Sequence, residues 1–169
     1  MSAPAITAAT PEAARFLQIF GVEHRTTMNV LQALPADKLD FKPHERHWTA
    51  AQLAWHIATS QYVVARIVAA GRFEMEPQTP APASLQEIVD GAENCYQKAC
   101  ETLGALTAEQ LAARIPLPGG RSMSASSLMW SGVLFHQIHH RGQLSIYIRL
   151  MGGKVPSIYG PSADENPFA

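Results

Sequence analysis

Three histidines lie close together in an apolar segment near the end of this 169-residue chain. They are His136, His139 and His140, within the run SMSASSLMWSGVLFHQIHHRGQLSIYIRLMGG at 122–153. On an α-helix, His136 and His140 point in nearly the same direction, whereas His139 lies about 100° away from His140. Imidazoles at positions i and i+4 can bind one divalent transition metal together.

The surroundings of these histidines favour neutral rings. No Asp or Glu occurs between residues 110 and 163, so a charged imidazole in a dry interior would lack a carboxylate nearby in the chain. The same stretch carries basic residues, which form either a solvated rim or a patch for an anionic substrate: Arg114, Arg121, Arg141, Arg149 and Lys154.

A third imidazole is expected from a facing helix. Thr49 and Gln52 have the spacing of a capping box, which predicts a helix start at this point. His56 then falls on the apolar stripe of this helix and is the candidate third ligand. Three protein ligands would leave at least one coordination position open, as in reactive rather than structural sites.

A simpler interpretation stays open beside the metal site, because a buried histidine is commonly a hydrogen-bonded core residue. His139 is interpreted as a neighbour of the cluster or an interface residue, and not as a ligand. His24 lies near the stripe of the first predicted helix, where a histidine is commonly a rim residue. The roles of His24 and His139 are therefore left open.

Two familiar metal sites are excluded by their missing residues. A zincin helix reads His-Glu-x-x-His with glutamate as the general base, and Gln137 occupies that position here. The chain also lacks the paired Glu-x-x-His motifs of a di-iron bundle.

The apolar periodicity predicts an all-α fold, a single-domain four-helix bundle over residues 1–169. Long crossing loops join the helices, residues 115–120 cross the end of the bundle as an extended segment, and an irregular tail ends the chain. The helices are expected at about 11–34, 49–70, 84–104 and 124–151.

Composition narrows the classes of partner. The formal net charge is −1, from 13 basic and 14 acidic residues, which provides no overall field for nucleic acid. No apolar run is long enough to span a membrane, and no secretory leader is apparent. Cys95 and Cys100 are spaced to project on different sides of a helix, so we expect a reduced, cytoplasmic protein.

Several of these residues together resemble the DinB-like family of damage-inducible proteins. The resemblance rests on the histidine in AAQLAWHIA, the run HQIHHRGQ and the closing RLMGGKVPSIYG. It implies metal ligands at His56, His136 and His140, in a four-helix bundle that is commonly dimeric. Some relatives are thiol-dependent transferases that use a low-molecular-weight thiol, and the association with DNA damage implies no nucleic-acid binding.

Two functional hypotheses account for such a site. In the first, a divalent metal (Zn, Ni, Fe or Mn) activates a thiol or water against a small electrophilic substrate. Gln143 would orient a ligand, and Arg141 or Arg149 would pair an anionic group. In the second, the chain is a non-catalytic metal-binding or stress-response bundle that acts through protein partners.

A homodimer is also expected, through the outer face of the fourth helix. That face is predicted to carry Leu134, Phe135 and Ile138, which are turned away from His136 and His140 on a helical projection.

Overall fold

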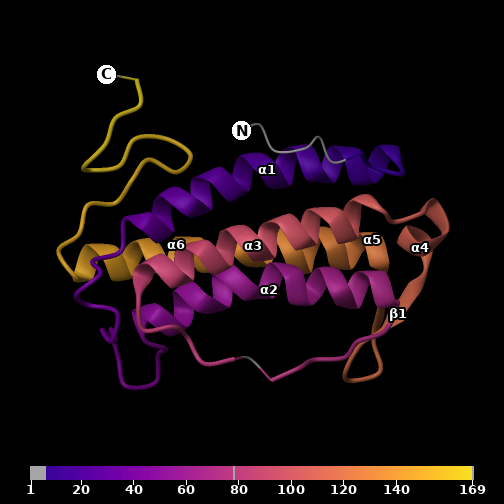
Figure 1. Ribbon diagram of the computed structural model, residues 1–169, viewed down its shortest axis with the longest axis horizontal. Helices are drawn as coiled ribbons and strands as arrows, with labels where there is room; N and C mark the ends of the chain where they lie inside the picture. The colour runs from indigo at the N-terminus through magenta and orange to yellow at the C-terminus, as the bar shows by residue number, and fades with distance from the viewer. Residues whose placement is uncertain (1–6, 78, 169) are drawn as a thin grey trace.

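Four long helices run lengthwise in the computed structural model, which describes residues 7–77 and 79–168 (Figure 1). They are α1 (Pro11–Gln32), α2 (Ala50–Ala70), α3 (Leu85–Gly104) and α6 (His136–Leu150). The shorter elements are α4 (Ala108–Ala112), β1 (Arg114–Pro116), β2 (Ser122–Ser124), α5 (Ala125–Leu128) and the π-helix η1 (Met129–Phe135). The all-α helical bundle predicted from the sequence is confirmed.

Side-chain caps explain where the first three long helices begin. The Thr10 hydroxyl accepts from the Ala13 amide at 3.1 Å, and Ser84 caps α3 in the same way. At α2, the Gln52 amide donates to the Thr49 hydroxyl and the Thr49 amide donates to the Gln52 side chain, which completes the expected capping box. Because these signals are local, the predicted starts lie within one residue of those observed.

The fourth predicted helix is not one continuous α-helix. The expected segment 124–151 divides into α5, the π-helix η1 and α6. Gly132 lies within η1 and approaches α2 closely, since a Cβ there would lie 2.9 Å from Val64. A π-turn holds more residues than an α-turn and therefore changes the rotation of the next helix, and here η1 ends immediately before His136.

A small hairpin replaces the extended segment predicted at 115–120. Strands β1 and β2 pair antiparallel, with Ile115 opposite Met123. Gly119 and Gly120, both with positive φ, form the turn between them. The sequence did not reveal the strands, because each has only three residues.

Buried polar side chains separate the core into two hydrophobic clusters. One cluster includes Phe16, Phe20 and Leu103, and the other includes Leu31, Ile57 and Ile148. Along α1 and α2, and between η1 and the second half of α6, buried polar residues lie between the parts assigned to the two clusters. They are His24 and Thr27 on α1, Ser60 and Gln61 on α2, and Gln137 and Arg141 on α6.

The predicted outer face of the fourth helix is wrong for two of its three residues. Leu134 is 2% exposed, and Ile138 is partly buried against the same hydrophobic cluster. Only Phe135 is well exposed, at 57%. The protein's own chain therefore covers most of that face.

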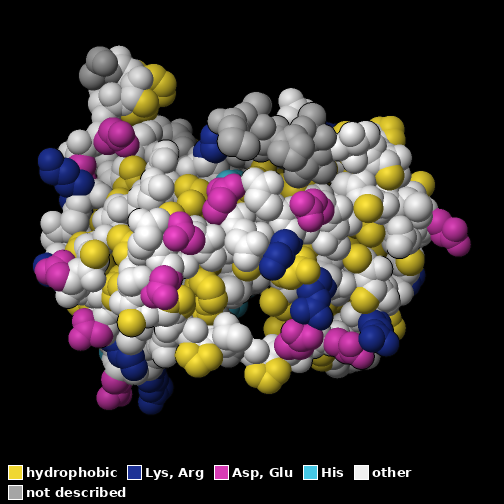
Figure 2. All heavy atoms as spheres, viewed as in Figure 1, with side chains coloured by type: hydrophobic (Ala, Val, Ile, Leu, Met, Phe, Trp, Pro, Cys, Tyr) yellow, Lys and Arg dark blue, Asp and Glu magenta, His cyan; other side chains and the backbone are white. Residues whose placement is uncertain are grey.

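The outer surface carries both signs of charge. On the face shown in Figure 2, acidic and basic side chains are interspersed over the molecule and form no continuous stripe of one sign. Within residues 7–77 and 79–168, no helix combines the length and apolar composition that a membrane crossing requires.

Candidate metal centre

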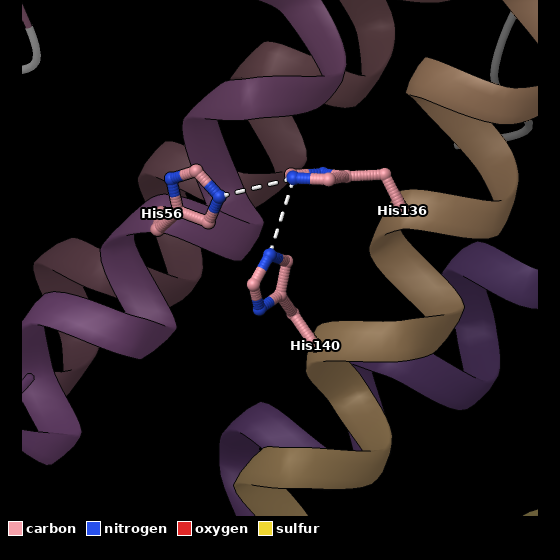
Figure 3. Close-up of side chains that lie close together, drawn as sticks. All are labelled: His56, His136 and His140. Carbon is pink, nitrogen blue, oxygen red and sulfur yellow. Dashed lines mark hydrogen bonds between the residues drawn. The ribbon is translucent and has the colours of Figure 1, made fainter. Parts of the chain in front are cut away.

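Three imidazoles from two helices converge in the structure. His56 projects from α2 toward His136 and His140 on α6 (Figure 3). Nε2 of His136 lies 3.3 Å from Nε2 of His56 and 3.1 Å from Nε2 of His140. One ring nitrogen from each histidine lies within 4.8 Å of the other two. The two helices thus bring together the three histidines selected from the sequence.

The spacing of these nitrogens suits a transition-metal ion. Metal–nitrogen bonds of about 2.0–2.1 Å place neighbouring ligand nitrogens roughly 2.8–3.4 Å apart in octahedral or tetrahedral geometry. The separations of 3.1 and 3.3 Å from His136 Nε2 to the other two Nε2 atoms fall in this range.

Gln143 determines which nitrogen of His140 faces the cluster. Its Oε1 lies 2.7 Å from His140 Nδ1. A carbonyl oxygen only accepts, so Nδ1 of His140 carries the proton and Nε2 presents a lone pair toward His136. A metal ligand needs this tautomer, and a hydrogen bond at the other ring nitrogen commonly sets it.

Protons alone cannot satisfy both contacts of the central ring, His136. Its Nε2 either carries a proton and donates to His140, or has a lone pair and accepts from His56. A cation between the three nitrogens would bind a lone pair from each of them. The donor set therefore fits a divalent metal.

Electrostatics keeps two of these rings neutral. Burial lowers the pKa of His136 to about 4, and the neighbouring His140, His56 and His139 act in the same direction. Burial also lowers the pKa of His140, although its hydrogen bond to Gln143 works against that shift. Both rings are thus neutral near pH 7, the form that binds metals.

A cavity opens beside the cluster at one end of the bundle. Its volume is about 440 Å³, and it lies between the loop before α2, the start of α2 and the middle of α6. Trp48 covers part of the cluster, since its ring centroid lies 4.8 Å from that of His56 and 6.2 Å from that of His140. The lining residues are Pro43, Arg46, His47, Trp48, Leu53, His140, Gln143, Ile146 and Tyr147.

Comparison with known proteins identifies the family. The family model described as "DinB family" matches residues 2–167. This chain belongs to the DinB family. Among proteins from Bacillus subtilis (strain 168), YrdA is 30% identical over 153 residues, with 89% of each chain covered. YjoA is 30% identical over 136 residues, which cover 78% of this chain and 86% of YjoA.

Solved structures of DinB-like proteins share the fold. A crystal structure from Bacillus cereus ATCC 10987 is 31% identical with a TM-score of 0.72, covering 85% of this chain and 95% of that one. The crystal structure of YjoA has a TM-score of 0.67 at 26% identity, with 83% of this chain and 93% of YjoA covered. The DinB resemblance stated from the sequence is confirmed.

Arg141 of this DinB-family chain does not reach the histidine cluster. Its side chain is 1% exposed, and its Nη2 lies 2.7 Å from a Glu23 carboxylate oxygen. It also donates to the Tyr159 hydroxyl at 2.6 Å and to the Glu23 carbonyl at 3.1 Å. The guanidinium is therefore engaged inside the bundle, and the expectation that it faces a substrate is wrong.

Arg149 is likewise engaged elsewhere. It pairs with Asp164 of the C-terminal tail, and it is not among the cavity residues. Of the three candidate catalytic residues, only Gln143 lies at the DinB histidine cluster and lines the cavity.

Gln137 is fully buried and joins three helices. Its amide donates to Gln61 at 3.1 Å, and its carbonyl accepts from Thr27 at 3.4 Å. The glutamine that replaces the zincin glutamate therefore joins α6 to α1 and α2. Its amide group is paired within the helix interfaces, where it has a structural role.

His24 is a buried residue, and the rim interpretation is wrong. It is 5% exposed, stacks on Tyr96 at a ring-centroid distance of 3.7 Å, and lies 2.9 Å from the Glu93 carboxylate. His139 is exposed, with its ring centroid 5.0 Å from that of His140. Neither histidine joins the cluster of three.

Sequence reasoning missed the residues that line the cavity before α2. The sequence predicts only a long crossing loop here, yet Arg46, His47 and Trp48 reach the cavity beside His140. The available signal was the run HERHW directly before the capping box. Binding and catalytic residues are often carried by loops that a rigid scaffold positions.

Proposed function

We propose that this DinB-family chain is a metal-dependent enzyme with His56, His136 and His140 as the metal ligands. In this proposal the metal is a divalent Zn, Ni, Fe or Mn ion, and the substrate is a small electrophilic molecule attacked by a thiol or water. The observation that carries the proposal is the cavity of about 440 Å³ that opens at His140. A purely structural metal site would need no such opening.

A bound dication with three neutral ligands would keep its charge uncompensated and lower the pKa of a thiol or water beside it. The chain's own residues supply the setting for this chemistry. Gln143 holds the His140 ring in the ligand tautomer, and Trp48 lies over His56 and His140 and limits access of bulk water. No acidic residue lines the cavity within the described chain, so an anionic nucleophile meets no repulsion there.

The test is comparative metal analysis of untagged protein. His56→Ala, His136→Ala and His140→Ala should each lose stoichiometric metal, whereas His139→Ala should retain it. Circular dichroism should show that all four variants remain folded. If His139→Ala lost metal while His140→Ala kept it, or if the parent bound none when metal was supplied, the proposed site would be wrong.

We also propose that the protein is a homodimer through α6. The supporting residues differ from those expected from the sequence, because Leu134 is buried. Phe135, the last residue of η1, and Ile146 and Leu150 on α6 are 57%, 59% and 57% exposed, and His139 and Gly142 lie between them at helical spacing. Large exposed apolar side chains along one helix are typical of a contact with another chain.

A further inference from the structure

The cavity beside the histidine cluster has a cationic group that no described protein carboxylate neutralises. Arg46 lines the cavity and is exposed, and its guanidinium makes no ion pair or hydrogen bond with any residue that the structure describes. Its backbone amide donates to His44 Nδ1 at 3.2 Å, which holds the loop at this point. The neighbouring Glu45 is not a lining residue.

The remaining wall of the cavity is largely apolar. Trp48, Leu53, Ile146 and Tyr147 line it, and they come from three segments of the chain. The Tyr147 hydroxyl donates to the Trp48 carbonyl at 3.2 Å, so this polar group is already paired. The wall therefore combines an unpaired cation with apolar and aromatic surface, and its volume of about 440 Å³ is in the range of small-molecule sites.

We propose that this cavity selects small organic carboxylates with an apolar, preferably aromatic, body. The carboxylate would pair with Arg46, whose planar guanidinium matches two carboxylate oxygens, while the body packs on Trp48 and Ile146. The opposite end of such a ligand would then lie toward His140. This inference rests on the proposed function for the meaning of the site, although the binding step needs no metal.

The experiment compares two ligands of matched shape on the full chain. The affinities of 2-naphthoate and its neutral analogue 2-naphthamide are measured by isothermal titration calorimetry, with metal-free protein. The parent should bind the acid about tenfold more tightly than the amide, as expected for one charge-assisted hydrogen-bonded pair. Arg46→Gln should reduce this ratio to about two or less and leave the amide affinity unchanged.

Two matched variants separate the charge of Arg46 from other effects. Lys42 is an exposed residue of the same loop and does not line the cavity. Lys42→Gln removes the same charge as Arg46→Gln and should keep the parent's ratio of acid affinity to amide affinity. Ile146→Ser should weaken acid and amide by the same factor, because the two ligands share the apolar body that packs on this wall. Circular dichroism checks that each variant is folded.

Equal affinity of the parent for acid and amide, or binding of neither, would overturn the inference. The inference would also be overturned if Lys42→Gln and Arg46→Gln lowered the ratio of acid affinity to amide affinity equally. Because these titrations use metal-free protein, they can fail while the metal analysis of the histidine variants succeeds. The reverse can also occur, so failure of this inference and failure of the proposed function are distinguishable.

Discussion

At the scale of single residues, Gln143 has the clearest effect on the histidine cluster. It is the hydrogen-bond acceptor of His140 Nδ1, at 2.7 Å, and lies one turn further along α6. Partners of this kind hold a ligand ring in one tautomer and one orientation. A substitution of Gln143 therefore tests metal binding by the cluster without removing a ligand.

We predict that Gln143→Met weakens metal binding by about 10- to 100-fold while His140 itself remains. The substitution keeps the length of the side chain and removes its acceptor. A competition titration with a metallochromic chelator measures the affinity. Gln86→Met, at an exposed position of α3, is the control and should bind as tightly as the parent. Equal affinities in both variants would show that His140 needs no acceptor.

We expect the buried His24 to make the stability of the protein depend on pH. Burial lowers the pKa of His24, its contact with Glu93 raises it less, and Arg25 lowers it slightly. The neutral ring donates from Nε2 to Glu93, which leaves Nδ1 buried without a hydrogen-bond partner among the described residues. Protonation would bury an unpaired N–H at Nδ1.

The unfolded chain has an ordinary histidine pKa of about 6.5, so below that pH it binds protons more readily than the folded chain. We predict that the free energy of unfolding falls as the pH is lowered through 6.5, and that this loss is absent above it. In the His24→Gln variant, the free energy of unfolding should fall less steeply with decreasing pH. Urea titrations at several pH values between 5 and 8 measure it. Parallel curves for parent and variant would contradict the prediction.

At the scale of secondary-structure elements, buried polar contacts fix how α6 lies against its neighbours. Arg141 joins α6 to α1 through Glu23, and the same guanidinium packs against Tyr159 of the tail, 5.1 Å from its ring centroid. Gln137 joins α6 to α2 through Gln61. These contacts favour one rotation of α6, and that rotation turns His136 and His140 toward His56.

We predict that Arg141→Met lowers the free energy of unfolding by about 3–5 kcal/mol, because it leaves the Glu23 carboxylate largely buried without its cation. The side chains of this pair are 1% and 12% exposed. Arg149→Met is the matched control, and its surface pair with Asp164 should leave stability nearly unchanged. Urea denaturation measures the free energy of unfolding of both variants. Equal decreases would show that the buried pair contributes no more to stability than the surface pair.

At the scale of the whole molecule, the proposed homodimer and the cavity share one surface. Ile146 belongs both to the exposed apolar residues of α6 and to the cavity lining. Gly142 lies on the same face, with nothing within 4 Å of a Cβ placed there. A second copy on α6 would therefore approach the mouth of the cavity.

We predict that light scattering gives about twice the chain mass of 18.4 kDa for the parent. Phe135→Glu combined with Leu150→Glu should return the monomer, because each change places a charge in an apolar contact. Val22→Glu changes a residue on α1 that is 49% exposed and should leave the dimer intact. A monomeric parent at micromolar concentration would contradict the proposal.

The sequence by itself determined the features that depend on neighbouring residues. The capping box at Thr49 and Gln52 placed the start of α2, because both hydrogen bonds lie within one turn. The shared direction of His136 and His140 follows from the α-helical repeat alone. The choice of His56 needed only the apolar stripe of α2, which had to face the core.

Only the tertiary structure decided which long-range partners each side chain found. Arg141 and Arg149 look alike in sequence, yet one is buried against Glu23 and the other pairs with Asp164 at the surface. Arg46 reaches the cavity because the loop before α2 folds toward α6, and no local periodicity encodes such a path. The sequence pattern marks residues that can be buried or can bind, but packing between distant segments selects their partners.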